Sequence, residues 1–312
     1  MEKETRPPNI LNYLSHLYDV IFKENNIRKV ERAIINCALV GFVVHLLLIF
    51  IAKHTYFNFS ILSQLPSSYL KAIYTPFSII LFYEVLTLVV ILPKSIVVFI
   101  GKQFEIITLI AIRSFFHDIA DYDLDKPDIY TFSFLKDISL DLVGALLLFF
   151  LTTIFYQLFA KTKKTNSNPS SKRTRFIHIK KTAAVVLSLL LLVLSVVSFV
   201  NWALHLYQVS AEGIAPHDPN SVFYKDFFSV MIFVDVFLLI LSFIYSGSYD
   251  LIFRNGGFVI STILVRIALT AQKPFNIYLA LTAVLFGVLL MALFVFYNQK
   301  VANTEGDEFT QN

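Results

Sequence analysis

Eight apolar runs, most of them about as long as a membrane span, constrain this chain more than any motif does. A hydrocarbon core of roughly 30 Å is crossed by a helix of about 20 apolar residues. The runs cover residues 35–53, 70–92, 102–118, 140–160, 182–207, 227–246, 257–272 and 275–297. The third and seventh runs are short and carry charge. Because 56% of the 312 residues are hydrophobic, the sequence predicts an all-α, polytopic membrane protein with eight transmembrane helices.

Lysines and arginines near the ends of the spans predict the topology, since basic loops are retained in the cytoplasm. The segment 161–181 has eight basic residues and no acidic one, and the first 34 residues are also rich in Lys and Arg. The loop 117–130 is acidic, as expected of the opposite side. With eight spans, every loop lies on the side of the membrane that its charge predicts, and both termini lie in the cytoplasm.

These features divide the chain into five predicted segments. They are a cytoplasmic N-terminal segment at 1–34, a four-helix membrane repeat at 35–160, a basic linker at 161–181, a second four-helix repeat at 182–299 and a disordered polar tail at 300–312. The N-terminal segment contains an amphipathic stretch with Ile10, Leu14, Leu17, Tyr18 and Ile21 on one helical face. We expect this helix to lie at the membrane interface, or to pack on another protein.

The two membrane segments resemble each other. "FSIILFYEVLTLVVIL" at 77–92 matches "FSVMIFVDVFLLILSF" at 228–243, with an acid at the same interval after Phe-Ser. An arginine follows each acid, 29 residues later in the first segment and 31 in the second. The sequence therefore predicts a tandem duplication of a four-helix unit. Because each repeat has four spans, an even number, both repeats begin on the same side of the membrane. They are therefore parallel rather than inverted.

The repeated charges are Glu84, Arg113, Asp235 and Arg266, and each is costly inside a bilayer. Counted from the cytoplasmic ends of their apolar runs, all four lie about 13–16 Å deep. We therefore expect Arg266 to be neutralised by Asp235, and Arg113 by Glu84. Such pairs either hold the helices in register or form a charge relay, voltage-responsive element or ion site. Glu105 is a second acid near Arg113 or an interfacial residue.

The second half is similar to the phosphate-starvation-inducible PsiE family of small bacterial inner-membrane proteins. The features that carry this resemblance are the acid in a Phe-rich helix, the aromatic inner loop with Arg254, the helix ending in "VRIAL" and the turn "AQKPFN". It covers residues 225–300 well and 70–118 more loosely. The resemblance implies a bacterial inner-membrane location and a link to phosphate stress, without a known reaction or ligand.

Motifs for catalysis or cofactor binding are missing from the sequence. There is no glycine-rich phosphate loop, His-Glu-x-x-His helix or nucleophile elbow. His45 and His205 lie on repeat-related helices and are expected to pack through hydrogen bonds, with a haem pair as the alternative. No cofactor and no metal site are predicted.

The sequence thus predicts a non-enzymatic integral inner-membrane protein, a stress-response scaffold or sensor with buried acid–arginine pairs. The alternative is an ion or proton channel or transporter that uses the same charges, and a membrane enzyme is the least favoured class. The expected partners are the lipid bilayer and, at the basic linker, anionic lipid or a cytoplasmic protein. Nucleic acid is not expected, and a homo-oligomer is compatible with the pattern.

Overall fold

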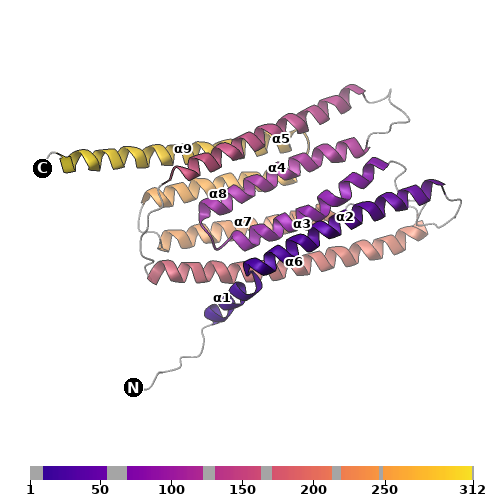
Figure 1. Ribbon diagram of the computed structural model, residues 1–312, viewed down its shortest axis with the longest axis horizontal. Helices are drawn as coiled ribbons and strands as arrows, with labels where there is room; N and C mark the ends of the chain where they lie inside the picture. Colours follow the sequence, from indigo (N-terminus) through magenta and orange to yellow (C-terminus); the bar gives the residue numbers. More distant parts are fainter. Residues whose placement is uncertain are drawn as a thin grey trace, which may run out of the picture.

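The computed structural model describes residues 10–54, 69–121, 131–162, 171–212, 219–245 and 249–310. The regular structure in these residues is helical. The helices are α1 (Ile10–Ile21), α2 (Glu24–His54), the 3-10 helix η2 (Tyr69–Ile73), α3 (Tyr74–Ile91), α4 (Ile96–Asp121), α5 (Thr131–Ala160), α6 (Ser171–Glu212), α7 (Pro219–Tyr245), α8 (Tyr249–Thr270) and α9 (Phe275–Thr310). Figure 1 shows the long helices lying lengthwise in one bundle, with α1 and the last turns of α9 at the same end. We call this end the α1 end.

Five helices are long and apolar enough to cross a membrane. These stretches are Glu24–Lys53, Phe134–Ala160, Thr174–Val197, Ile252–Thr270 and Phe275–Tyr297, and shorter apolar stretches occupy Thr75–Ile91 and Phe227–Ser242. Large apolar side chains on several of these helices point outward, including Leu39 of α2, Phe149 of α5 and Leu189 of α6. Outward-facing apolar side chains are favourable where the surroundings are lipid chains, so the chain has the surface of a membrane-embedded protein.

Helices that are consecutive in the chain pack on one another, α2 through α5 in the first half and α6 through α9 in the second. The halves meet where α5 packs on α9, α4 on α8 and α3 on α6. One hydrophobic cluster joins α1, α3, α4, α6 and α7, and another joins α4, α5, α8 and α9. Each cluster therefore draws helices from both halves, so the described helices form one bundle with α4 in both clusters.

Helix α1 folds back on its own chain. It packs mainly on α6, and the Tyr18 hydroxyl donates a hydrogen bond to the backbone carbonyl of Val90. Ser15 contacts His178 at 2.7 Å, and the Lys181 ammonium lies 2.7 Å from the Asp19 carboxylate. Burial and the nearby Asp19 carboxylate raise the pKa of Tyr18 to about 12, so this donor keeps its proton. Of the predicted apolar face, Leu14, Leu17 and Tyr18 thus pack within the protein itself, whereas Ile21 is 44% exposed. The side chain of Ile10 lies outside those that the structure describes.

Two segment boundaries differ from those predicted. Helix α6 begins at Ser171, inside the segment 161–181 that the sequence suggested was a linker. The reason is that α1 and the end of α3 pack against these first turns, which gives a basic segment a buried face. Helix α9 also continues to Thr310, through the tail predicted to be disordered.

A glycine allows α9 to approach α4 closely at Phe104. The side chain of Phe104 on α4 is fully buried, lies edge-on to Phe155 of α5 with ring centroids 5.0 Å apart, and contacts α9 at Gly287. A Cβ atom at Gly287 would lie 2.4 Å from the Phe104 ring and 3.0 Å from Ser261 Oγ. Because the ring is enclosed on both sides, it has no room to move away.

We predict that Gly287→Ala destabilises the protein by about 1–3 kcal/mol, the usual effect of overpacking. This loss occurs even though alanine is the better helix former. The measurement is the thermal unfolding midpoint of the detergent-solubilised protein. Gly256→Ala is the matched control, since a Cβ there would meet no atom within 4 Å. Equal behaviour of the two variants would contradict the close α4–α9 contact.

Candidate functional site

Asp235 and Arg266 form a buried ion pair between α7 and α8, as the sequence predicts. The Nη2 and Nε atoms of Arg266 lie 2.8 and 3.1 Å from the same carboxylate oxygen, Oδ2 of Asp235. Both side chains are only 2% exposed. The guanidinium carbon also lies 5.9 Å from the centre of the Phe228 ring. A helical side chain leans toward the N-terminus of its helix, which lets Arg266 reach back along α8 to Asp235.

The same guanidinium joins the two halves of the chain. Nη2 of Arg266 donates a second hydrogen bond, 3.1 Å long, to Oε1 of Gln103 on α4. Gln103 is buried, and the sequence analysis did not select it. The sequence does carry a signal for Gln103, which is an amide inside an apolar run. Amides inside membranes commonly form hydrogen bonds between helices. Arg266 therefore contacts α7 and α4 at once.

The predicted partner of Glu84 was wrong. Oε2 of Glu84 lies 2.6 Å from the Nζ atom of Lys102, and the two side chains are 13% and 15% exposed. The contact has the distance of an ion pair, although its angle is not that of a hydrogen bond. Arg113 follows Lys102 by about three helical turns along α4, too far along the helix to take this place. It is half-buried and has interaction partners of its own.

The depth predicted for Arg113 was wrong because the residues of α4 were counted from Lys102. The helix begins six residues earlier, at Ile96, so Arg113 lies farther from the α1 end than the count suggested. The acids and arginines of the two halves are thus not arranged alike. In the second half the acid meets the arginine, whereas in the first half it meets a lysine nearer the turn between α3 and α4.

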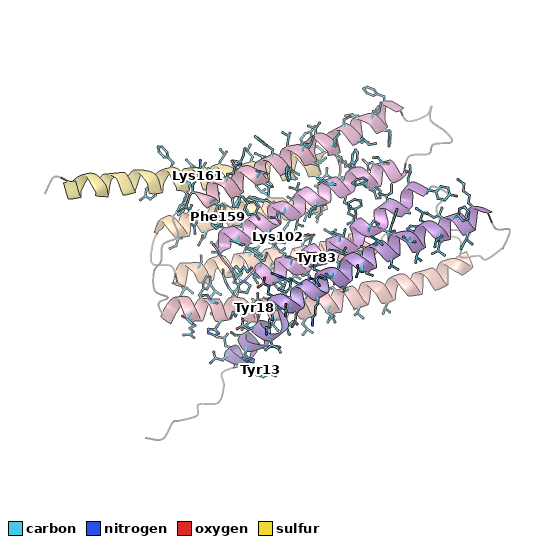
Figure 2. All side chains as sticks on the ribbon, viewed as in Figure 1. Tyr13, Tyr18, Tyr83, Lys102, Phe159 and Lys161 are labelled. Atoms are coloured by element: carbon cyan, nitrogen blue, oxygen red, sulfur yellow. The ribbon has the colours of Figure 1, made fainter. Side chains whose placement is uncertain are left out.

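Glu105 belongs to the group around Lys102. Its Oε2 accepts a hydrogen bond of 2.9 Å from Lys102, and its Oε1 accepts one of 2.6 Å from the Tyr156 hydroxyl on α5. Lys102 thus lies between two carboxylates, Glu84 and Glu105, and the group spans α3, α4 and α5. Figure 2 labels Lys102 on α4 and Tyr18 on α1, both toward the α1 end of the bundle.

A second lysine between two carboxylates lies at the opposite end of the bundle. The Nζ atom of Lys273, in the turn between α8 and α9, is 2.5 Å from Asp118 of α4 and 2.7 Å from Asp141 of α5. Asp141 is fully buried. Burial alone would lower the pKa of Lys273, but the contacts with both carboxylates outweigh it and raise the pKa above its usual value. No local sequence pattern predicts this group, because its members come from three separate segments.

Lys180 is the most deeply buried lysine among the described side chains, with 4% of its surface exposed. Its ammonium donates a hydrogen bond of 3.1 Å to the carbonyl of Lys94, just after α3 ends, and lies 4.9 Å from the centre of the Phe176 ring. Lys94 lies in the turn between α3 and α4, so Lys180 gives a hydrogen-bond donor to a backbone carbonyl of that turn. Lys180 lies in the segment 161–181, which the sequence predicted to be a basic linker.

The remaining candidate residues have packing contacts or fall outside the described side chains. Nδ1 of His45 lies 2.6 Å from the Thr75 hydroxyl, which joins α2 to α3. The Arg254 guanidinium lies over the Phe294 ring at 4.4 Å and contacts the Asn255 side-chain oxygen at 3.2 Å. The side chain of His205 is not among those described, so the structure does not test a haem pair.

We predict that Lys273→Met destabilises the protein by roughly 3 kcal/mol, because it leaves the buried Asp141 carboxylate without its cation. The measurement is the thermal midpoint in detergent, with Lys136→Met on the exposed face of α5 as the control. A lysine with a raised folded-state pKa contributes stability that is fully present below the unfolded value of about 10.4. That contribution is lost only as the pH rises through the higher folded value. The difference from wild type should thus persist as the pH rises from neutral to about pH 10, and a loss over that rise would contradict the pairing.

The buried charges can hold neighbouring helices together, because their ion pairs join different helices. Among the described residues, no group of three or more His, Cys, Asp or Glu side chains could hold a metal ion. No family model, curated protein or solved structure matches this chain.

Proposed function

We propose that this protein is a non-enzymatic scaffold or sensor of a bacterial inner membrane, crossing it eight times with both termini in the cytoplasm. The observation that carries the proposal is the position of Arg266, which contacts Asp235 and Gln103 and thereby joins both halves in the interior. A buried charge whose partners lie on two neighbouring helices of the same chain has the construction of a structural element. The resemblance to the PsiE family supports the bacterial location and a role in a stress response.

The count of eight spans combines the five long apolar helices with α3, α7 and α4. Helices α3 and α7 carry the two shorter apolar stretches. Helix α4 has too many charges for a simple hydropathy criterion, yet it is 26 residues long, or about 39 Å. It packs against α3, α5 and α8, and its Lys102 and Gln103 have partners on neighbouring helices. Internal pairing of this kind makes a charged helix compatible with a membrane.

The orientation is supported by the charges at the two ends of the bundle. Lys161, Arg175 and Lys181 lie at the α1 end, while Asp118 and Asp141 lie toward the opposite end, around Lys273. An excess of basic residues is typical of the cytoplasmic side. The basic segment 161–181 remains a proposed contact for anionic lipid or a cytoplasmic protein.

A duplication of a four-helix unit is part of the proposal. The order of helix contacts is similar in the two halves, and equivalent helices pack on each other as α4 with α8 and α5 with α9. That pattern is expected of parallel repeats related by an axis near the membrane normal. The different partners of Glu84 and Asp235 mean that the halves have diverged in their buried charges.

Exchanging the charges of Asp235 and Arg266 tests the structural role. Each neutralising variant, Asp235→Asn or Arg266→Gln, should lose about 3–5 kcal/mol, because it leaves one charge buried and unpaired. The double variant Asp235→Arg/Arg266→Asp should recover much of this loss, since the Gln103 amide can turn and donate to a carboxylate. Thermal midpoints and the yield of folded protein provide the measurement.

Glu24→Gln, in an exposed pair with Arg28, is the control and should leave the midpoint unchanged. A double variant as damaged as the single ones would refute the structural role. The transport alternative is tested by ion and proton flux into liposomes containing the purified protein, with Asp235→Asn and Glu84→Gln for comparison. The proposal predicts no flux, and flux that is abolished by both variants would contradict it.

A further inference from the structure

Lys273 and its two aspartates form a group with one more negative than positive charge. The Nζ atom of Lys273 lies 2.5 Å from Oδ2 of Asp118 on α4 and 2.7 Å from Oδ2 of Asp141 on α5. Because both contacts are made to one nitrogen atom, the two carboxylates are also close to each other. Carboxylates that share a site repel each other, and this repulsion favours the binding of a proton by one of them. The excess negative charge therefore makes the group a candidate proton acceptor.

Asp141 is the member of the group whose charge is less compensated. Its side chain is 0% exposed, whereas that of Asp118 is 19% exposed. Its Oδ2 contacts Lys273, but its Oδ1 is buried and accepts no hydrogen bond from any described group. A buried acceptor without a donor is costly, and a proton on Oδ1 removes that deficit together with the buried charge. The Ser114 hydroxyl on α4 adjoins this carboxylate and can accept a hydrogen bond from the added proton.

Asp118 has a second basic neighbour and is in contact with solution. Its Oδ1 lies 3.8 Å from Nδ1 of His117, and a protonated histidine there favours the ionised form of Asp118. The side chains of His117 and Lys273 are 51% and 30% exposed. The group is thus open to protons from the side opposite the α1 end, although the Asp141 side chain itself is enclosed.

The surrounding helices add no further described charge at Asp141. Their charged and titratable side chains that the structure describes are Arg113 on α4, Lys136 and Asp137 on α5, Arg266 on α8, Tyr278 on α9 and Tyr69 on η2. Arg113 has interaction partners of its own, Arg266 pairs with Asp235, and Lys136 is exposed. The side chains of Lys71 and Asp121 are not among those described. Among the described groups, the charges that act on Asp141 are those of Lys273 and Asp118.

Proton binding changes how firmly Lys273 joins the helices around it. With Asp141 ionised, Lys273 ties the turn between α8 and α9 to both α4 and α5. A proton on Asp141 replaces the ion pair with α5 by a weaker hydrogen bond to a neutral carboxyl group, and it leaves the ion pair with α4. Helix α9 begins at Phe275, just after Lys273, and packs along α5. The proton therefore loosens the α8–α9 turn at the start of the α5–α9 contact.

We propose that Asp118, Asp141 and Lys273 form a proton-binding site, at which acidification of the side opposite the α1 end weakens the contact between α5 and the α8–α9 turn. A hydronium ion gives its proton to Oδ1 of Asp141, so one O–H bond breaks, another forms, and the charge of the group changes from minus one to zero. The site extends the sensor role in the proposed function by naming acid as the stimulus. It rests on that proposal for the identity of the compartment, which is the one outside the cytoplasm.

The test is infrared difference spectroscopy of the full chain in lipid nanodiscs, as the pH is lowered from about 8 to about 4. The wild type should gain the carbonyl-stretching band of a protonated carboxylic acid, and Asp141→Asn should lack that band. Asp137→Asn, one helical turn earlier on α5, is the matched control and should keep it.

The two neighbours of Asp141 should shift the pH at which this band appears in opposite directions. Asp118→Asn removes the nearby negative charge, so the band should appear at a pH about one unit or more lower. Lys273→Met removes the positive charge, so the band should appear at a pH about one unit or more higher.

Hydrogen exchange of the backbone amides in the α8–α9 turn measures the loosening. At about pH 7 the wild type should exchange at least about threefold more slowly than Asp141→Asn, because only the wild type has the ion pair with α5. At the acidic end of the titration the two proteins should exchange alike. Comparison at the same pH cancels the effect of pH on the chemical exchange rate.

The proposal is overturned if the wild type gains no band, if the band persists in Asp141→Asn, or if the Asp118 and Lys273 variants do not shift it in opposite directions. Turn amides that exchange alike in wild type and Asp141→Asn at about pH 7 would overturn it as well. If Asp141→Asn does not fold, the shifts in the other two variants decide the result. The charge exchange of Asp235 and Arg266 leaves this group unchanged, so the scaffold role and the proton site are refuted by different outcomes.

Discussion

An arginine in the interior of a membrane protein needs acceptors for its hydrogen-bond donors, and this requirement shapes the bundle around Arg266. A guanidinium keeps its charge in proteins, so it cannot avoid the penalty of burial by losing a proton. Asp235 and Gln103 supply the acceptors, and they come from α7 and α4. Because α4 belongs to the first half and α7 to the second, satisfying one residue fixes the position of both halves.

Similar contacts hold the two ends of the bundle. Near the α1 end, Tyr18 and Lys180 donate to the backbone carbonyls of Val90 and Lys94, and Lys102 lies between Glu84 and Glu105. At the opposite end Lys273 joins α4, α5 and the turn before α9. The apolar surfaces of these helices would pack in many registers, since Leu, Val and Phe make contacts without direction. The buried polar contacts select one register, because each requires a particular donor to meet a particular acceptor.

The sequence predicted well what depends on local pattern. Apolar runs predicted the helices and their membrane character, and the acid–arginine spacing in the second half predicted the contact of Asp235 with Arg266. The prediction from sequence was wrong for the partner of Arg113, because that depends on where α4 begins. The contacts of Lys273 with its two aspartates were not predicted, because they join segments that are distant in the chain. Lys180 was missed because a basic segment before a span is normally solvated. Only the packing of α1 and the end of α3 on α6 shows that this lysine is buried.

The most direct measurement is an experimental structure of the full chain in lipid nanodiscs, at a resolution that shows side chains around Arg266. The guanidinium should lie within hydrogen-bonding distance of the Asp235 carboxylate and the Gln103 amide, with α4 between α3 and α8. A map in which Arg266 points to lipid or to an open aqueous passage, with Asp235 and Gln103 turned elsewhere, would contradict it.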